Sequence, residues 1–161
     1  MTEPRGIAVR EARLPDDKPV LLGFIDGLQR YEAAFEADRR LDAAYAEDQF
    51  AELFKKAERG AIFVAENDDR LAGWILVIEV DGPAYVIEEE RRYACICELF
   101  VDEAVRGQGA GRALMAACED WARAKNLATI HIGHLAENAR AAHVYDKAGY
   151  APYVVLRRKR L

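Results

Sequence analysis

One stretch of sequence decides the fold of this chain: Val101-Asp102-Glu103-Ala104-Val105-Arg106-Gly107-Gln108-Gly109-Ala110-Gly111-Arg112-Ala113-Leu114. Before it lies a run rich in β-branched and aromatic residues, Cys95–Val101, which predicts a strand. After it, apolar residues recur at helical spacing. A strand and a helix joined by alternating glycines leave main-chain N–H groups uncovered at the positive end of the helix. The stretch therefore predicts an anion-binding loop.

The anion is best interpreted as a pyrophosphate, because Arg106 and Arg112 flank the loop and each could reach a phosphate. A tight strand–helix turn that merely uses glycine is the alternative. A Rossmann fingerprint would need a glycine where Arg112 stands, and a Walker loop needs a Gly-Lys-Ser/Thr sequence that the chain lacks. These departures disfavour a dinucleotide or a nucleoside triphosphate.

Composition limits the other function classes. The 161 residues are 52% hydrophobic and 32% charged, and they predict one domain over residues 1–161. A net charge of −5 argues against general nucleic-acid binding. No apolar run approaches the roughly 20 residues of a membrane span, so we expect no membrane partner. Three cysteines and a polar N-terminal stretch predict a reducing compartment, the cytoplasm.

The first half of the chain predicts a strand, two helices and a β-hairpin, over residues 7–12, 20–31, 45–57, 61–66 and 70–79. Asp16 and Asp17 stand where an N-cap and a first-turn acid would lie. Gly60 is expected to end the second helix in a left-handed conformation. The sequence Asn67-Asp68-Asp69 has the turn chemistry of a hairpin.

In the second half, the charged run 88–92 is expected to be a solvated rim. The strand at 95–101 is followed by a helix to about residue 126 and a short strand over 128–134. Asn138 is expected to cap a helix that runs to Ala148, with Gly149 as its left-handed end. Residues 150–156 predict a last strand. The order βααβββαβαβ indicates an α/β or α+β fold with a mixed sheet.

Two motifs give this pattern a family resemblance. The segment Arg106-x-x-Gly109-x-Gly111 is similar to the acetyl-CoA signature of the GNAT superfamily of N-acetyltransferases. A second segment resembles the superfamily's Asn…Ala…Tyr-x-Lys-x-Gly-Phe sequence and reads Asn138-x-x-Ala141-x-x-x-Tyr145-x-Lys147-x-Gly149-Tyr150. The resemblance implies a mostly antiparallel central sheet flanked by helices. It also implies acetyl-CoA as cosubstrate. No metal is expected, because His131, His134 and His143 lack the spacing of metal ligands and Cys95-x-Cys97 has no second pair to complete a zinc site.

The resemblance further assigns residues to coenzyme A. The pantetheine arm would run along the backbone of Leu99, Phe100 and Val101 like an added strand, in a gap beside the strand 128–134. The pyrophosphate would lie on the loop of Arg106, Gly107, Gln108, Gly109, Ala110, Gly111 and Arg112. Asn138 would hold the cofactor arm, although an N-cap role alone explains it. Lys147 would reach a phosphate or remain solvated.

Acetyl transfer to an amine needs a base more than an acid. Deprotonating an amine of pKa about 10.4 at pH 7 costs roughly 4.6 kcal/mol, against roughly 2 kcal/mol to reprotonate a thiolate of pKa about 8.5. Glu98 is the candidate base, because a carboxylate between Ile96 and Phe100 in an apolar strand is costly unless its pKa rises or it is paired. A strand carboxylate that pairs with arginine or faces solvent is the alternative. His134 is held as a reserve base.

Tyr145 is the candidate acid. It lies seven residues after Asn138, on the same helical face two turns on, and the resemblance assigns its hydroxyl to the departing sulfur. Taken alone, an aromatic residue on a short helix more often packs in the core.

In the fold that the resemblance implies, the link between the first two helices helps to wall the acceptor pocket. Here that region holds Tyr31, Glu32, Phe35, Glu36 and Asp38, which mix rings with acids. Such a lining suits a small cationic amine or a peptide amine, although an ordinary acidic helix end is equally consistent. The alternative function is a non-catalytic acyl-CoA-binding regulator on the same fold. A homodimer is a further hypothesis, since Tyr153 would line either a dimer contact or the last strand.

Overall fold

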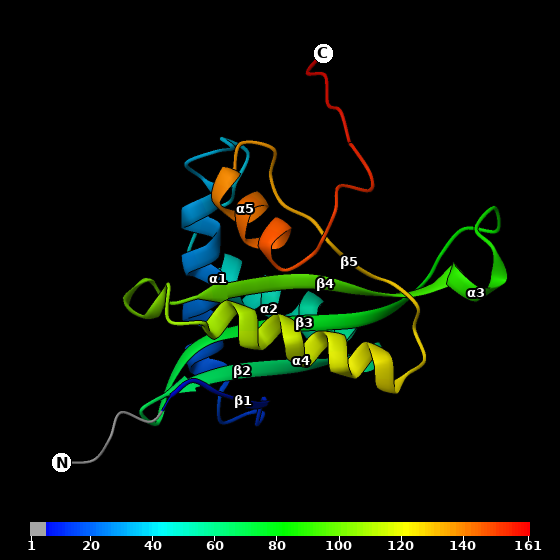
Figure 1. Ribbon diagram of the computed structural model, residues 1–161. Coiled ribbons are helices and arrows are strands. Elements are labelled where there is room, and N and C mark those ends of the chain that lie inside the picture. Colours follow the sequence, from blue (N-terminus) through cyan, green and yellow to red (C-terminus); the bar gives the residue numbers. More distant parts are fainter. Residues whose placement is uncertain (1–5) are drawn as a thin grey trace.

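Five strands form one sheet in the order in which they occur in the chain. The structure is a computed structural model, and it describes residues 6–161. Neighbouring strands are antiparallel except β4 and β5, which run parallel. The elements are β1 (Ala8–Glu11), α1 (Lys18–Glu32), α2 (Tyr45–Lys56), β2 (Gly60–Asn67), β3 (Arg70–Asp81), α3 (Glu88–Arg91), β4 (Arg92–Val101), α4 (Ala110–Ala124), β5 (Ile130–Ile132) and α5 (Ala139–Lys147), with 3₁₀ turns at Ala57–Arg59 and Glu103–Val105 (Figure 1).

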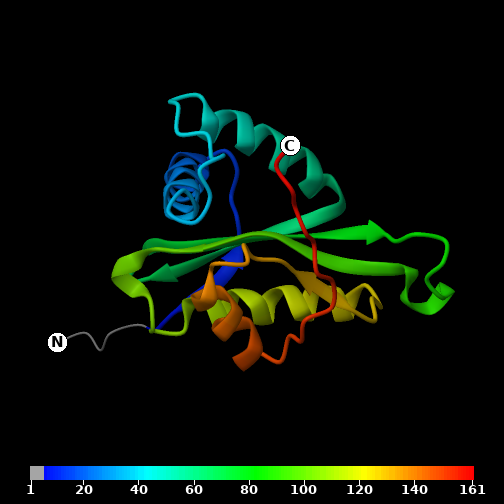
Figure 2. The ribbon, with the colours of Figure 1, turned by 90° about the horizontal axis from the view of Figure 1, so that it is seen from above.

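Helices cover both faces of the sheet. Helices α1 and α2 lie on one face, and α4 and α5 lie on the other (Figure 2). Each face has its own hydrophobic core. Leu21 and Trp74, both fully buried, belong to the α1–α2 side, and Leu114 and Val77 belong to the α4 side. The strand pairing and the burial on both faces together confirm the expected fold, a mixed and mostly antiparallel sheet flanked by helices.

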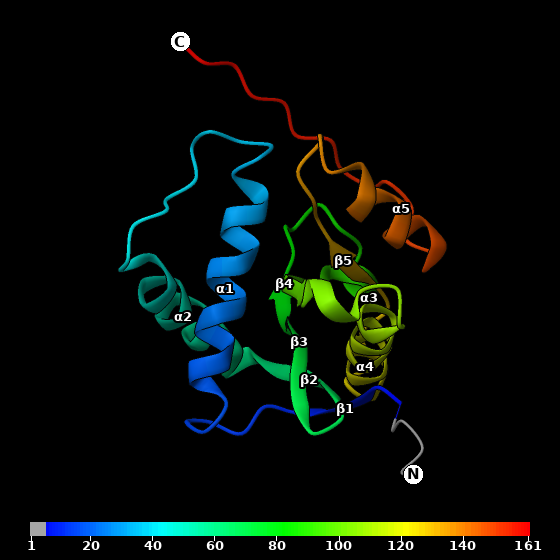
Figure 3. The ribbon, with the colours of Figure 1, turned by 90° about the vertical axis from the view of Figure 1, so that its left-hand side faces the viewer.

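A β-bulge in β4 opens the sheet. Leu76 of β3 faces Glu98 but Val77 faces Ile96, so Cys97 is an extra residue on β4. The pairing of β4 with β5 stops at Ile96, directly before the bulge. Since a bulge bends its strand, the end of β4 and the end of β5 diverge. The expected gap beside the strand 128–134 is therefore present (Figure 3).

The turns are partly as expected. Asp68 and Asp69 both have positive φ angles, of 48° and 63°, as a two-residue hairpin turn requires. The prediction for Gly60 was wrong: its φ of −158° is extended, and the residue begins β2. Asp17 is the N-cap residue of α1 but does not cap it with its side chain. Its carboxylate instead accepts hydrogen bonds from the Arg13 N–H and from Arg10.

The predicted last strand was also wrong. Residues 151–161 form neither strand nor helix, and every one of them is exposed. Pro152 has no N–H to donate to a ladder, and the sheet edge offered by β5 is only three residues long. The segment instead continues from the α5 side of the sheet to the α1–α2 side (Figures 2 and 3).

Candidate active site

The divergence of β4 from β5 creates a cavity of about 450 Å³. Its walls come from α1, α2, β4, β5, α5 and the loop that leads into α4. The cavity is thus bounded by both halves of the molecule, and the bulge residue of β4, Cys97, is part of its wall. Residues far apart in the sequence, such as Tyr31 and Glu98, meet on its surface.

The glycine loop, which we define as residues 107–112, forms one end of this cavity. Gly107 and Gly109 have φ angles of +80° and +92°, in the left-handed region that favours glycine. Within residues 6–161, no acceptor is found for the main-chain N–H groups of Gly109, Ala110, Gly111 and Arg112. These N–H groups lie at the start of α4, where the helix dipole adds positive charge. The arrangement suits a diphosphate.

The two flanking arginines differ. The Arg106 Nε donates to the main-chain oxygen of Val101 at 3.0 Å, and its guanidinium lies 5.5 Å from the ring centre of Tyr31 and 5.7 Å from that of Phe100. Arg106 therefore connects the glycine loop to the end of β4 and to α1. Arg112 lines the cavity with an exposed side chain, and so does Arg140 at the start of α5. Both are placed for anionic groups at the cavity mouth.

Gln108 does not line the cavity. Its side chain accepts a hydrogen bond from Asn67 and donates to the Ala104 main-chain oxygen. Its own N–H donates to the main-chain oxygen of Val105 at 3.3 Å. Within the described residues, Gln108 is therefore the loop residue whose N–H is already paired.

The edge of β4 offers main-chain groups to the cavity. The Asp102 N–H donates to the Ala72 oxygen on β3. Because hydrogen-bonding direction alternates along a strand, the main-chain groups of Leu99 and Val101 point away from β3, toward the gap, whereas those of Phe100 point toward β3. An added strand would therefore contact Leu99 and Val101. Phe100 contributes its ring, which packs 5.5 Å from that of Phe24.

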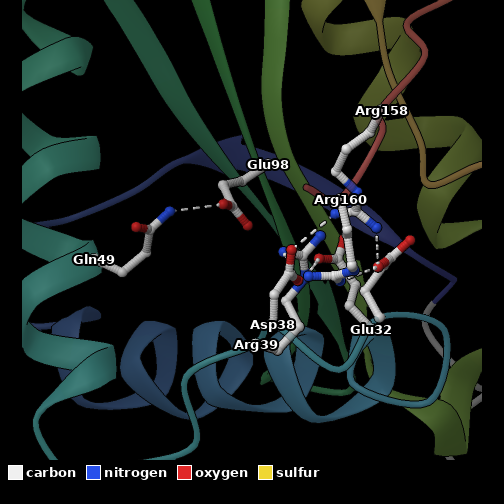
Figure 4. Close-up of polar contacts among 8 residues, drawn as sticks. Glu32, Asp38, Arg39, Gln49, Glu98, Arg158 and Arg160 are labelled. Carbon is white, nitrogen blue, oxygen red and sulfur yellow. Dashed lines mark hydrogen bonds and ion pairs between the residues drawn. The ribbon is translucent and has the colours of Figure 1, made fainter.

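Glu98 faces the cavity on the α1–α2 side. Its Oε1 accepts a hydrogen bond from Gln49 Nε2 of α2 at 3.1 Å (Figure 4). Burial raises the pKa of Glu98 to about 7, with a further contribution from the nearby carboxylate of Glu32. Strand alternation predicts that Ile96, Glu98 and Phe100 share one face of the sheet. Phe100 does lie on the α1–α2 side with Glu98, but the prediction for Ile96 was wrong, because the bulge turns it to the α4 side. A pKa near 7 suits a group that accepts a proton at neutral pH.

Tyr145 and Asn138 line the opposite wall, on α5. The Asn138 Oδ1 accepts from the Ala141 N–H at 3.1 Å and from the Tyr31 hydroxyl at 3.3 Å, so the expected N-cap is confirmed. Burial raises the pKa of Tyr145 to about 12, again with help from Glu32. Within residues 6–161 the Tyr145 hydroxyl has no hydrogen-bond partner, and it is protonated at neutral pH. It is free to donate.

Only some of the residues predicted to bind the acceptor line the cavity. Tyr31 and Glu32 line the cavity, whereas Phe35 does not and instead packs its ring edge-on against Tyr31, 5.2 Å away. Glu32 forms an ion pair of 3.2 Å with Arg39. Tyr45 of α2 also lines this end, and burial raises its pKa to about 12.

Among the remaining candidates, His134 lines the cavity with its ring 5.9 Å from that of Tyr145. Its Nδ1 lies 2.8 Å from the Leu135 main-chain oxygen. Lys147 is exposed and lies outside the cavity wall. Residues 6–161 contain no group of three His, Cys, Asp or Glu side chains placed to hold a metal ion, and none of their helices is long and apolar enough to cross a membrane.

The model of the acetyltransferase (GNAT) family matches residues 21–150. The chain belongs to the GNAT family. Members of this family are acetyltransferases that use acetyl-CoA, so acyl transfer is the general activity of this GNAT chain.

Solved structures share the fold. A mutant of the BH1408 protein from Bacillus halodurans has a TM-score of 0.82 at 20% identity, over 96% of this chain and 99% of that chain. A GCN5-related N-acetyltransferase from Ralstonia eutropha JMP134 has a TM-score of 0.74 at 19% identity, over 96% and 98%. Glucosamine-6-phosphate N-acetyltransferase from Arabidopsis thaliana has a TM-score of 0.66 at 14% identity, over 97% and 99%. None of the curated proteins matches the sequence.

Three residues of this site were missed by the sequence predictions: Tyr45, Gln49 and Arg140. Tyr45 and Gln49 are four residues apart on one face of α2, and a glutamine between Tyr45 and the buried Phe50 and Leu53 was a usable signal. Arg140, two residues after the N-cap, carried no signal of its own. Its role follows only from the position of α5 beside the glycine loop.

Proposed function

We propose that this chain transfers an acetyl group from acetyl-CoA to a primary amine, by direct attack of the amine on the thioester. One observation carries the proposal: four free main-chain N–H groups lie in the same cavity as Glu98 and Tyr145. A diphosphate on the glycine loop would leave a pantetheine arm to follow Leu99 and Val101 toward the bulge. Arg112 and Arg140 would meet the remaining phosphate charge.

The proton transfers follow from the two shifted groups. Acetyl-CoA supplies the activated acyl group and a thiolate leaving group. Glu98, with a pKa of about 7, accepts the proton of the incoming ammonium, directly or through water, and Gln49 fixes the carboxylate by its hydrogen bond. The Tyr145 hydroxyl donates a proton to the leaving sulfur. Glu98 has the larger task, because the amine pKa lies further from 7 than the thiol pKa.

The acceptor is a cationic amine, either a small molecule or a peptide side chain. Glu32 lines the acceptor end of the cavity, and its charge acts on both Glu98 and Tyr145. A carboxylate so placed attracts an ammonium to the base that must deprotonate it.

Release of free thiol from acetyl-CoA tests the proposal, with a panel of a polyamine, an aminoglycoside, a lysine-containing peptide and an anionic amine. We expect turnover with the cationic amines and a decrease in kcat of roughly 30-fold in Tyr145→Phe, which is the roughly 2 kcal/mol of thiolate protonation. The control is Tyr85→Phe, at a tyrosine that is 89% exposed. Coenzyme A binding without turnover of any amine would support the regulator instead, and preference for the anionic amine would contradict the acceptor class.

A further inference from the structure

The C-terminal segment, residues 151–161, crosses from α5 to the loop between α1 and α2 (Figure 3). Every residue in it is exposed. Within the described chain its ion pairs are those of Arg158 and Arg160, and its ring contact is Tyr153 on His131, with 5.1 Å between the centroids. A segment with so little buried surface can detach at small cost.

Arg158 forms ion pairs with two carboxylates. Its Nη2 lies 2.6 Å from Glu36 Oε2 and its Nη1 lies 2.9 Å from Asp38 Oδ2. Arg160 adds a longer ion pair of 3.9 Å to Glu36. We call Glu32, Glu36 and Asp38 the acidic rim, and Figure 4 shows the two arginines gathered on it.

The acidic rim has more carboxylates than the neighbouring residues of its own loop neutralise. Arg39 pairs with Glu32 at 3.2 Å and with Asp38 at 2.9 Å. Three carboxylates against this one guanidinium leave two negative charges without a partner from the same loop. The C-terminal segment brings two positive charges to them, on Arg158 and Arg160.

The acidic rim also continues the acceptor end of the cavity. Glu32 belongs to both, because it lines the cavity and pairs with Arg39. Glu36 and Asp38 follow it along the chain, outside the cavity wall, and the C-terminal segment lies against them through Arg158.

We propose that the acidic rim binds an arginine side chain of a basic peptide acceptor, and that the chain's own residues 157–160 occupy this surface until such an acceptor displaces them. The inference rests on the proposed function, of which it narrows the substrate class. Arg158 remains 51% exposed, so its ion pairs are screened and the internal competitor is weak. Its removal is expected to tighten peptide binding by about three- to tenfold.

Fluorescence anisotropy tests this with a labelled synthetic peptide that has the sequence of residues 155–161. The full-length Arg158→Ala chain is compared with Arg157→Ala, which removes the same charge from a neighbour that makes no ion pair within the described residues. We expect Arg158→Ala to bind the peptide about three- to tenfold more tightly than Arg157→Ala and the unmodified chain. Citrulline in place of arginine at peptide position 158, or Glu36→Gln in the Arg158→Ala chain, should abolish the gain.

Equal affinity of the two arginine variants, or equal binding of the citrulline peptide, would overturn the proposal. This readout needs neither acetyl-CoA nor turnover, so a chain that failed to bind coenzyme A would contradict the proposed function while leaving the rim measurement valid. Kinetics then test the acceptor role. In Arg158→Ala the KM for a basic, lysine-containing peptide should fall while the KM for acetyl-CoA stays unchanged, and an unchanged peptide KM would contradict an acceptor surface.

Discussion

At the glycine loop the cavity offers a ligand the main-chain N–H groups of consecutive residues, whereas at the acceptor end it offers side chains from three separate elements. The loop groups are fixed by the backbone angles of Gly107 and Gly109. The acceptor groups depend on contacts between α1, α2 and β4, such as that of Gln49 with Glu98. One end is therefore set by local sequence, and the other by tertiary packing.

The two ends also differ in how they lower the stability of the fold. The glycine loop requires positive φ angles, and the free-energy cost of this backbone conformation is small for glycine. The acceptor end buries a carboxylate beside another carboxylate, which raises the pKa of Glu98 and destabilises its charged form. Substitutions at the two ends should consequently differ in what they change.

The largest expected effect is on catalysis. Glu98→Gln removes the proton acceptor but keeps a hydrogen-bonding side chain next to Gln49, so kcat should fall by about 10²- to 10⁴-fold. In the unmodified chain kcat/KM should decrease below pH 7, as Glu98 becomes protonated, and this inflection should be absent from the variant. The exposed Glu52→Gln on α2 is the control. A variant with the original rate and pH profile would rule out Glu98 as the base.

The same substitution should stabilise the fold in a pH-dependent way. Because the pKa of Glu98 is raised in the folded state, its contribution to stability is greatest below 4.5 and is lost as the pH rises through about 7. The difference corresponds to about 3 kcal/mol. Urea unfolding should show Glu98→Gln and the original chain as equal near pH 4, with the variant about 3 kcal/mol more stable at pH 8. A constant difference across that range would contradict the raised pKa.

In the glycine loop, a substitution should lower the stability of the fold through the backbone conformation. Gly109→Ala forces a Cβ into a φ of +92°, at a cost of roughly 1–2 kcal/mol. Gly23→Ala is the matched control, because Gly23 lies in α1 with open space around it and alanine is expected to stabilise a helix there by roughly 0.5–1 kcal/mol. Opposite shifts of the unfolding midpoint are expected. An unchanged or higher unfolding midpoint in Gly109→Ala would show that the loop conformation does not need glycine.

The contrast between the two ends explains what the sequence could predict. The glycine loop, the N-cap at Asn138 and the left-handed Gly149 all depend on residues within a few positions of one another, and each is present. Glu98 was recognisable as a charge in an apolar strand. Its hydrogen bond to Gln49 was not, because it joins residues 49 positions apart.

The failures have the same origin. A bulge at Cys97 adds one residue to β4 and reverses which face Ile96 occupies, and no local pattern in 95–101 signals it. The apolar run Tyr153–Leu156 has strand-like composition, yet a strand requires a partner with free N–H and C=O groups. Arg158 finds Glu36 and Asp38 instead. Such a contact between distant parts of the sequence is set by the fold.

Calorimetric titration with coenzyme A tests the central claim most directly, that the free N–H groups of residues 109–112 hold a diphosphate. Heat of binding is expected for the unmodified chain, with an affinity about tenfold weaker in Gly109→Ala, as the loss of roughly 1.4 kcal/mol implies. No heat from the unmodified chain, or equal affinity in Gly109→Ala, would contradict the claim.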